Sequence, residues 1–125
     1  MINGAHTIIS ATDAEAARAF FRDVLGLAHV DAGHGWLIFR SPPAELAVHP
    51  AEEADSGRAE LYLMCDDLHA TIDELTAKGV EFVGGISEER WGSRTALQVP
   101  GAGQIGLYQP RHPVAYDLEP GTADG

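Results

Sequence analysis

A degenerate internal repeat constrains the fold of this chain more than any other feature of its sequence. A helical pattern that stops at glycine occurs at Phe20–Leu27 and again, more faintly, at Ile72–Val80. In each copy a strand-like run precedes the helix, and further strand-like runs follow it. A repeat of this kind predicts two similar modules that pack together. It also pairs positions between the two halves of the chain.

The first copy is predicted to begin with a strand at residues 3–10 and to continue with a helix. Thr12 is the predicted N-cap of this helix, and Glu15 completes a capping box. Gly26 is predicted to end the helix, because glycine readily adopts the left-handed conformation found there. The apolar residues that recur at helical spacing are Ala17, Phe20, Phe21, Val24 and Leu25.

The second copy follows a polar, acidic linker at residues 51–57. A strand is predicted at 58–65, and Asp66 or Asp67 is predicted to cap a helix that ends at Gly79. Turn-forming residues separate the shorter apolar runs on either side. The strands predicted after the two helices are 27–32, 35–40 and 44–49 in the first half, and 80–84, 92–99 and 104–109 in the second.

The element order is therefore βαβββ twice, which predicts an α+β fold in a single domain spanning residues 1–125. Module 1 covers about 3–50 and module 2 about 58–110, and a loosely ordered tail is expected at 111–125. Two such modules side by side form one curved mixed sheet with helices on its convex face. The concave face is then a cup, and ligand sites favour concave surfaces of this kind.

Composition excludes several classes of partner. The net charge is −11, from 19 acidic and 8 basic residues, so no basic face is expected for nucleic acid. The chain has no run of about 18 apolar residues, so no membrane partner is expected. The single cysteine, Cys65, cannot form an internal disulfide, and no secretory signal is recognisable. A reduced, cytoplasmic setting is therefore expected.

Four segments carry a resemblance to a known family: Gly4–Ile8, Phe20–Leu27, Met64–Leu68 and Trp91–Pro110. Together they resemble the vicinal oxygen chelate superfamily, which includes glyoxalases, bleomycin-resistance proteins, fosfomycin-resistance enzymes and extradiol dioxygenases. Their order and spacing cover nearly all of residues 3–110, although each motif alone is weak. The resemblance implies a divalent metal in the cup, held by residues from the first and last strands of each module. It also implies a homodimer that pairs through sheet edges or swapped modules.

The repeat locates the positions where this resemblance places metal ligands: His6, Leu46, Glu60 and Gly106. Leu46 and Gly106 have no donor atom, so a degenerate site with His6 and Glu60 as its metal ligands is predicted. An imidazole and a carboxylate suit Zn, Mn, Ni or Fe, but two protein ligands hold such an ion weakly. Alternatively, the two side chains hydrogen-bond to each other without a metal.

Strand alternation assigns side chains to the cup face, which is predicted to be aromatic and apolar with few polar groups. Such a lining suits a small, partly aromatic organic ligand. The alternative is that Tyr62, Met64 and Tyr108 fill a core. Cys65 is expected to face the helices, and His112 is expected to be a surface residue of the tail. The predicted ligand-binding residues are His6, Ile8, Trp36, Val48, Tyr62, Met64, Trp91, Arg94 and Tyr108.

These features lead to three functional hypotheses. The first is a glyoxalase/bleomycin-resistance-like protein that binds a partly aromatic molecule in the cup, for sequestration or carriage. The second is a divalent-metal-dependent lyase, isomerase or dioxygenase, in which the metal polarises vicinal oxygens of the substrate. The third metal ligand of such an enzyme would be a residue at another position of this chain than the repeat indicates, or a residue from a partner subunit. The third hypothesis is metal-free acid–base catalysis by Glu60.

Overall fold

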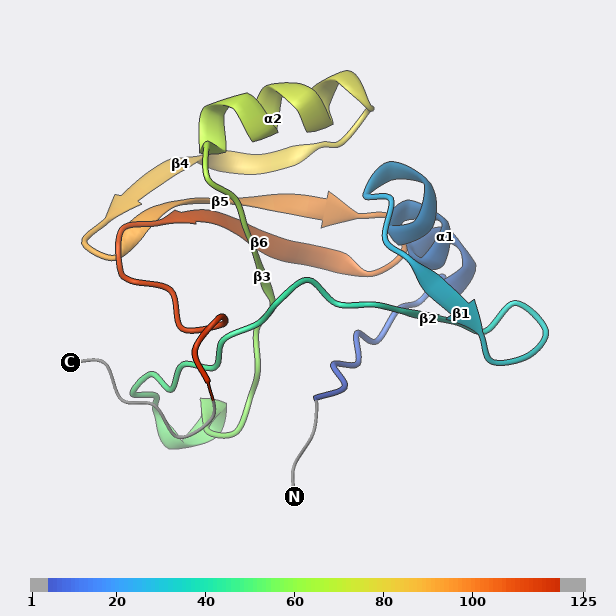
Figure 1. Ribbon diagram of the computed structural model, residues 1–125, viewed down its shortest axis with the longest axis horizontal. Coiled ribbons are helices and arrows are strands. Elements are labelled where there is room, and N and C mark those ends of the chain that lie inside the picture. The colour runs from blue at the N-terminus through green and yellow to red at the C-terminus, as the bar shows by residue number, and fades with distance from the viewer. Residues whose placement is uncertain (1–4, 120–125) are drawn as a thin grey trace.

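A four-stranded mixed sheet forms the centre of the molecule (Figure 1). The computed structural model describes residues 5–119 of the 125-residue chain. The spatial order of the strands is β3-β6-β5-β4, in which β3 runs parallel to β6 and the other neighbours are antiparallel. This sheet is built entirely from the second half of the chain. Its strands are β3 (Tyr62–Met64), β4 (Phe82–Glu89), β5 (Gly92–Val99) and β6 (Gly103–Pro110).

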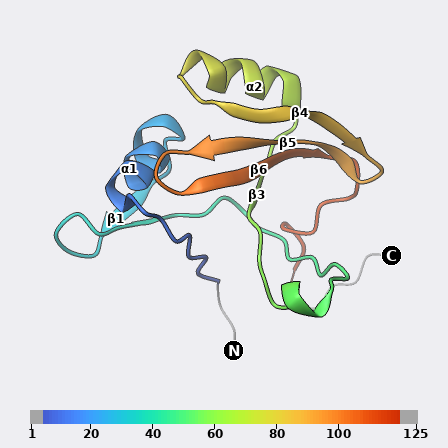
Figure 2. The same cartoon turned by 180° about the vertical axis from the view of Figure 1, so that it is seen from behind.

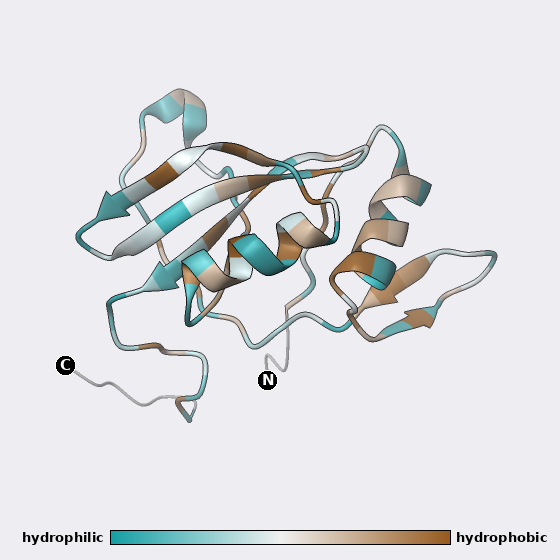
Figure 3. Ribbon diagram, turned by 90° about the horizontal axis from the view of Figure 1, so that it is seen from above, coloured by the Kyte–Doolittle hydropathy of each residue, from teal (hydrophilic) through white to brown (hydrophobic). Residues whose placement is uncertain are grey.

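Helix α2 (Leu68–Ala77) connects β3 to β4 and covers one face of the sheet (Figure 3). Of the two predicted caps, Asp67 is the N-cap, since its Oδ1 accepts a hydrogen bond from the Ala70 N–H at 3.1 Å. The chain leaves the helix through Gly79, whose φ of +88° favours glycine. The core lies between the two helices and the sheet, and consists of Ala17, Phe20, Leu68, Leu75, Val80, Leu97, Val99, Ile105 and Leu107.

Helix α1 (Ala14–Ala19) continues into a π-helical turn at Phe20–Val24. Its N-cap is Asp13 and not the predicted Thr12, because Asp13 Oδ1 accepts from the Ala16 N–H at 3.0 Å. The Thr12 hydroxyl instead donates to the Gly101 carbonyl at 3.2 Å, in the turn between β5 and β6. The Thr12 hydroxyl is therefore used in a contact with a distant segment, although the local sequence pattern predicted it to cap the helix.

The remainder of the first half contributes a two-stranded antiparallel hairpin, β1 (His29–Asp31) and β2 (Leu37–Phe39). The hairpin lies beside α1 at one end of the molecule, as the view from behind also shows (Figure 2). Asp31 closes the turn, since its Oδ1 accepts from the Gly33 N–H at 2.7 Å. Among the described residues, no helix is long and apolar enough to cross a membrane.

Two of the predicted strands are wrong within the described residues. Residues 5–10 and 44–49 are irregular, and Ile8, Leu46 and Val48 are 79%, 94% and 90% exposed. A strand needs a neighbour for its backbone N–H and C=O groups, and no neighbouring strand lies beside either segment. Residues 3 and 4 of the first predicted strand, and 120–125 of the predicted tail, lie outside the described residues. The α+β fold class itself is confirmed.

Candidate functional site

Three aromatic side chains meet on the face of the sheet that is turned away from α2, here called the open face. Tyr62 comes from β3, Trp91 from the turn between β4 and β5, and Tyr108 from β6. Their ring centroids are 5.3 to 6.3 Å apart, and every pair is nearly perpendicular. Such edge-to-face pairs each contribute about 0.5–1.5 kcal/mol beyond the area they bury. These three residues form the aromatic cluster, and all are half-buried.

Strand alternation explains why the two tyrosines share this face. On β6, Ile105 and Leu107 are buried in the core, so Gly106 and Tyr108 point the other way. Tyr62 lies directly opposite Gly106 in the parallel register of β3 and β6. The tyrosines therefore occupy adjacent positions on neighbouring strands, at a distance where aromatic side chains make contact.

Gly106 provides the space that the Tyr62 ring fills. A Cβ atom at position 106 would lie 2.1, 2.3 and 2.7 Å from the Cδ1, Cε1 and Cγ atoms of Tyr62. No side chain fits there unless the ring moves. Sequence comparison between the two halves indicates only that position 106 lacks a donor atom. The structure adds that an aromatic ring covers this position.

A basic side chain lies at one edge of the aromatic cluster. Arg94, opposite Tyr108 on β5, donates from Nη1 to the Tyr62 hydroxyl at 3.5 Å. Its Nε donates to Glu89 Oε1 at 3.4 Å, so part of its charge is balanced. A guanidinium carries five N–H donors, and these two contacts leave others available for an oxygen acceptor on a ligand.

A carboxylate and an imidazole lie beside the Tyr108 hydroxyl. The Tyr108 hydroxyl donates to Glu45 Oε1 at 3.1 Å and lies 3.3 Å from His112 Nε2. Burial, followed by the Glu45 carboxylate, raises the pKa of Tyr108 to about 12. The hydroxyl therefore stays protonated at neutral pH. His112 was predicted to be a surface residue of the tail; its side chain is 35% exposed, and its ring centroid lies 6.1 Å from that of Tyr108.

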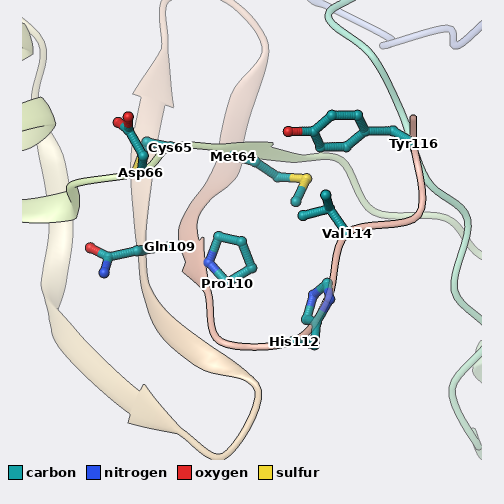
Figure 4. Close-up of a pocket in the computed structure, with 8 residues that line it drawn as sticks. All are labelled: Met64, Cys65, Asp66, Gln109, Pro110, His112, Val114 and Tyr116. Carbon is teal, nitrogen blue, oxygen red and sulfur yellow. The ribbon is translucent and has the colours of Figure 1, made fainter. Parts of the chain in front are cut away.

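A pocket of about 660 Å³ lies next to the cluster, where residues after β6 turn back over the end of β3 (Figure 4). In Figure 4 the side chains of Met64, Val114 and Tyr116 gather at one end, and Asp66 and Gln109 lie at the other. The pocket thus has an apolar end and a polar end. Its lining residues are Met64, Cys65, Asp66, Gln109, Pro110, His112, Val114 and Tyr116.

Cys65 lines this pocket but is a poor nucleophile. Its side chain packs against the core, and the thiol donates to the Tyr108 carbonyl at 3.6 Å. Burial raises the pKa of the thiol, so the reactive thiolate is scarce at neutral pH.

The other predicted site residues lie elsewhere. Trp36 is in the turn of the hairpin, 63% exposed, with the Arg18 guanidinium 4.6 Å from its ring centroid. Ile8 and Val48 lie on the exposed irregular segments. The structure therefore brings together Tyr62, Trp91, Arg94 and Tyr108, with Met64 in the adjacent pocket. Sequence reasoning missed Glu45, because it lies in a segment predicted to be a strand and carries no recognisable motif.

The predicted metal ligands lie on exposed segments of irregular backbone. His6 and Glu60 are both exposed and lie outside the strands, since β3 begins only at Tyr62. Within residues 5–119, no three His, Cys, Asp or Glu side chains lie close enough to hold a metal ion. Leu46 offers no donor, and Gly106 is covered by the Tyr62 ring. This donor set does not fit a divalent metal, which generally needs three protein ligands at a catalytic site.

A mixed four-stranded sheet with a covering helix, preceded by a helix and a hairpin, defines a small α+β protein with an aromatic open face. The chain belongs to the Glyoxalase/Bleomycin resistance protein/Dioxygenase superfamily, which it matches over residues 4–104. The resemblance inferred from the four sequence segments is thereby confirmed. None of the curated proteins matches the chain significantly.

Several solved structures share this fold. TnmS3, an antibiotic binding protein from Streptomyces sp. CB03234, is 21% identical and has a TM-score of 0.59, over 88% of this chain and 98% of its own. A superfamily member from Sphaerobacter thermophilus DSM 20745 is 23% identical with a TM-score of 0.58, over 86% and 98%. Lactoylglutathione lyase from Agrobacterium tumefaciens is 19% identical with a TM-score of 0.56, over 79% and 87%. At these identities the likeness establishes the fold alone.

Proposed function

We propose that this protein binds a small, partly aromatic molecule on the open face of its sheet and acts by sequestering or carrying it, without a catalytic metal. The aromatic cluster carries this proposal. Its three half-buried rings offer apolar surface to a planar ligand, while Arg94 and Tyr108 place polar groups at the edges. A few polar groups around an aromatic surface are typical of small-molecule sites. The antibiotic-binding activity named for TnmS3 supports this class of function.

The two tryptophans allow a direct test. In Trp36→Phe the emission reports on Trp91 alone, and in Trp91→Phe it reports on Trp36 alone. Titration with a panel of aromatic natural products should give a saturable change in Trp91 emission and little change in Trp36 emission, because only Trp91 belongs to the cluster. Tyr62→Ala should weaken the same ligand. If no compound gives a saturable change at Trp91, the binding proposal fails.

Metal analysis separates this proposal from the enzymatic alternative. Protein purified without chelator is expected to contain far less than one equivalent of Zn, Mn, Ni or Fe, because no three donors among the described residues lie close enough to hold a metal ion. A near-stoichiometric metal that a chelator removes would contradict the proposal and favour a metal-dependent lyase, isomerase or dioxygenase. Metal-free catalysis by Glu60 predicts turnover that is lost in Glu60→Gln, whereas a binding protein retains its affinity in that variant.

We also propose that the protein is a homodimer. Residues 5–10 and 44–49 have strand-like sequences but lack a neighbouring strand, and they expose Ile8, Leu46 and Val48. A second copy offers partner backbone for these segments and removes apolar side chains from water. Sedimentation equilibrium should give twice the chain mass, and Leu46→Glu should weaken the association. A monomeric wild-type protein at tens of micromolar would contradict this.

A further inference from the structure

Glu45 differs from every neighbour in its segment. From residue 40 to residue 60 it is the only residue that is not exposed, and its side chain is 16% exposed. Burying a carboxylate is costly unless hydrogen bonds replace its water. The position of Glu45 therefore depends on the partners that it meets across the fold.

Those partners lie far along the sequence, in strand β6 and in the segment that follows it. The Tyr108 hydroxyl donates to Oε1 at 3.1 Å, and the Ala115 backbone N–H donates to Oε2 at 2.8 Å. His112 Nε2 lies 3.7 Å from Oε1. One carboxylate thus joins the loop of the first half, strand β6 and the segment that follows β6.

That following segment, residues 111–116, is here called the strap. At its start, the Arg111 N–H donates to the Trp91 carbonyl at 2.8 Å. The Arg111 guanidinium donates to the Glu89 carbonyl at 2.7 Å and to Ser93 Oγ at 2.9 Å, and it pairs with Glu88. The start of the strap is therefore attached to the turn that carries Trp91.

The strap forms a wall of the pocket between its two attachments. His112, Val114 and Tyr116 line the pocket from the strap, facing Met64 of β3 (Figure 4). Arg111 attaches the strap at one end, and Glu45 attaches it at Ala115. The tail predicted to be loosely ordered is thus held in place over the described residues 111–116, at the site itself.

We propose that Glu45 is a positioning residue of the ligand site, whose carboxylate holds the Tyr108 ring and the strap in one arrangement. This rests on the proposed function, since it concerns the same open face and pocket. The aromatic cluster and the pocket wall belong to the second half of the chain, whereas the group that orients them comes from the first. Loss of Glu45 releases the Ala115 end of the strap and one edge of the cluster, while the Arg111 end stays attached.

Glu45→Ala removes both acceptors, and Glu45→Gln retains one oxygen while placing an amide NH₂ where the second acceptor stands. Glu52→Gln is the matched control, because Glu52 lies in the same loop and is exposed. Chymotrypsin cleavage after Tyr116, next to the Glu45 contact at Ala115 and identified by mass spectrometry, reports release of this end of the strap. We expect cleavage to be about tenfold faster in Glu45→Ala, the factor that corresponds to one lost charge-assisted hydrogen bond. Glu45→Gln should fall between, and Glu52→Gln should match the wild type.

Two further readouts test positioning rather than general stability. The pKa of Tyr108, about 12 in the folded protein, should fall in Glu45→Ala, although burial still raises it. Tyrosinate absorbance at 295 nm, corrected with Tyr108→Phe, measures this change. The dissociation constant of 1-anilinonaphthalene-8-sulfonate, an aromatic anion used as the probe, should rise about tenfold in Glu45→Ala. Circular dichroism should show the wild-type fold in each variant.

The outcomes separate the two proposals. Wild-type cleavage and wild-type Tyr108 titration in Glu45→Ala overturn the role of Glu45, whether or not the probe binds. If the wild-type protein binds neither the probe nor any other aromatic compound, while Glu45→Ala still releases the strap, the binding function fails and the contact between Glu45 and the strap stands.

Discussion

Replacing Gly106 with alanine tests the packing on which the aromatic cluster depends. The new Cβ would lie 2.1 Å from Tyr62 Cδ1 and 2.7 Å from Tyr62 Cγ, both well inside van der Waals contact. Because Cγ is close to the backbone, the Tyr62 ring cannot avoid the clash by moving only its tip. The side chain must change rotamer, and its edge-to-face contacts with Trp91 and Tyr108 are then lost.

The magnitude follows from these two effects. Overpacking costs about 1–3 kcal/mol, and each lost aromatic pair costs about 0.5–1.5 kcal/mol. Replacing glycine with alanine also reduces the conformational freedom of the unfolded chain, which raises the free energy of unfolding by about 0.4–1 kcal/mol. A net loss of about 2–4 kcal/mol in the free energy of unfolding is expected. With a slope of about 2 kcal/mol per molar urea, the denaturation midpoint should fall by about 1–2 M.

Urea denaturation followed by circular dichroism measures this loss, and two variants control it. Gly85→Ala in β4 is the matched control, because a Cβ there meets nothing within 4 Å, and its midpoint should barely change. In a Tyr62→Ala background, Gly106→Ala should cost almost nothing, since no ring remains to be displaced. The coupling between the two positions should then equal the cost of Gly106→Ala in the wild type, about 2–4 kcal/mol. An equal cost of Gly106→Ala in both backgrounds would refute the packing argument.

Asp67→Ala removes the side-chain oxygen that caps α2, and the free energy of unfolding measured in urea should fall by about 1 kcal/mol; an unchanged value would mean that the cap contributes nothing. Alkylation of Cys65 by iodoacetamide should be slow at neutral pH and should accelerate only above the usual thiol range, because burial raises the pKa of the thiol. A rate at pH 7 equal to that of free cysteine would contradict this. Stability should fall as pH rises from about 10 towards about 12, because Tyr108 ionises first in the unfolded chain. Tyr108→Phe should lose less stability over this range, and an identical alkaline profile would argue against the raised pKa.

Local patterns predicted much of the second half. The helix that ends at Gly79 and the strand at 92–99 depend on contacts within short stretches, where periodicity and turn residues are informative. The alternation that buries Ile105 and Leu107 and turns Gly106 and Tyr108 to the other face follows from strand geometry alone.

The first half shows where such patterns fail. Residues 44–49 alternate like a strand, and this alternation assigned Leu46 and Val48 to the cup. In the structure both are exposed, and Glu45 turns inward instead. Alternation describes which faces a strand would have, but pairing requires another backbone alongside. Thr12 illustrates the same limit, because its hydroxyl contacts Gly101 across the fold instead of capping the adjacent helix.

The sequence by itself determined the α+β class, the repeat, the membership of the superfamily and the absence of donor atoms at Leu46 and Gly106. Only the tertiary structure decided that Tyr62 fills the space over Gly106, that Trp91 joins two tyrosines from neighbouring strands, and that Glu45 holds the strap. The reason is physical. The periodicity of apolar residues indicates which side of one helix or strand is buried. A site, by contrast, is made by side chains from segments that become neighbours only when the whole chain has folded.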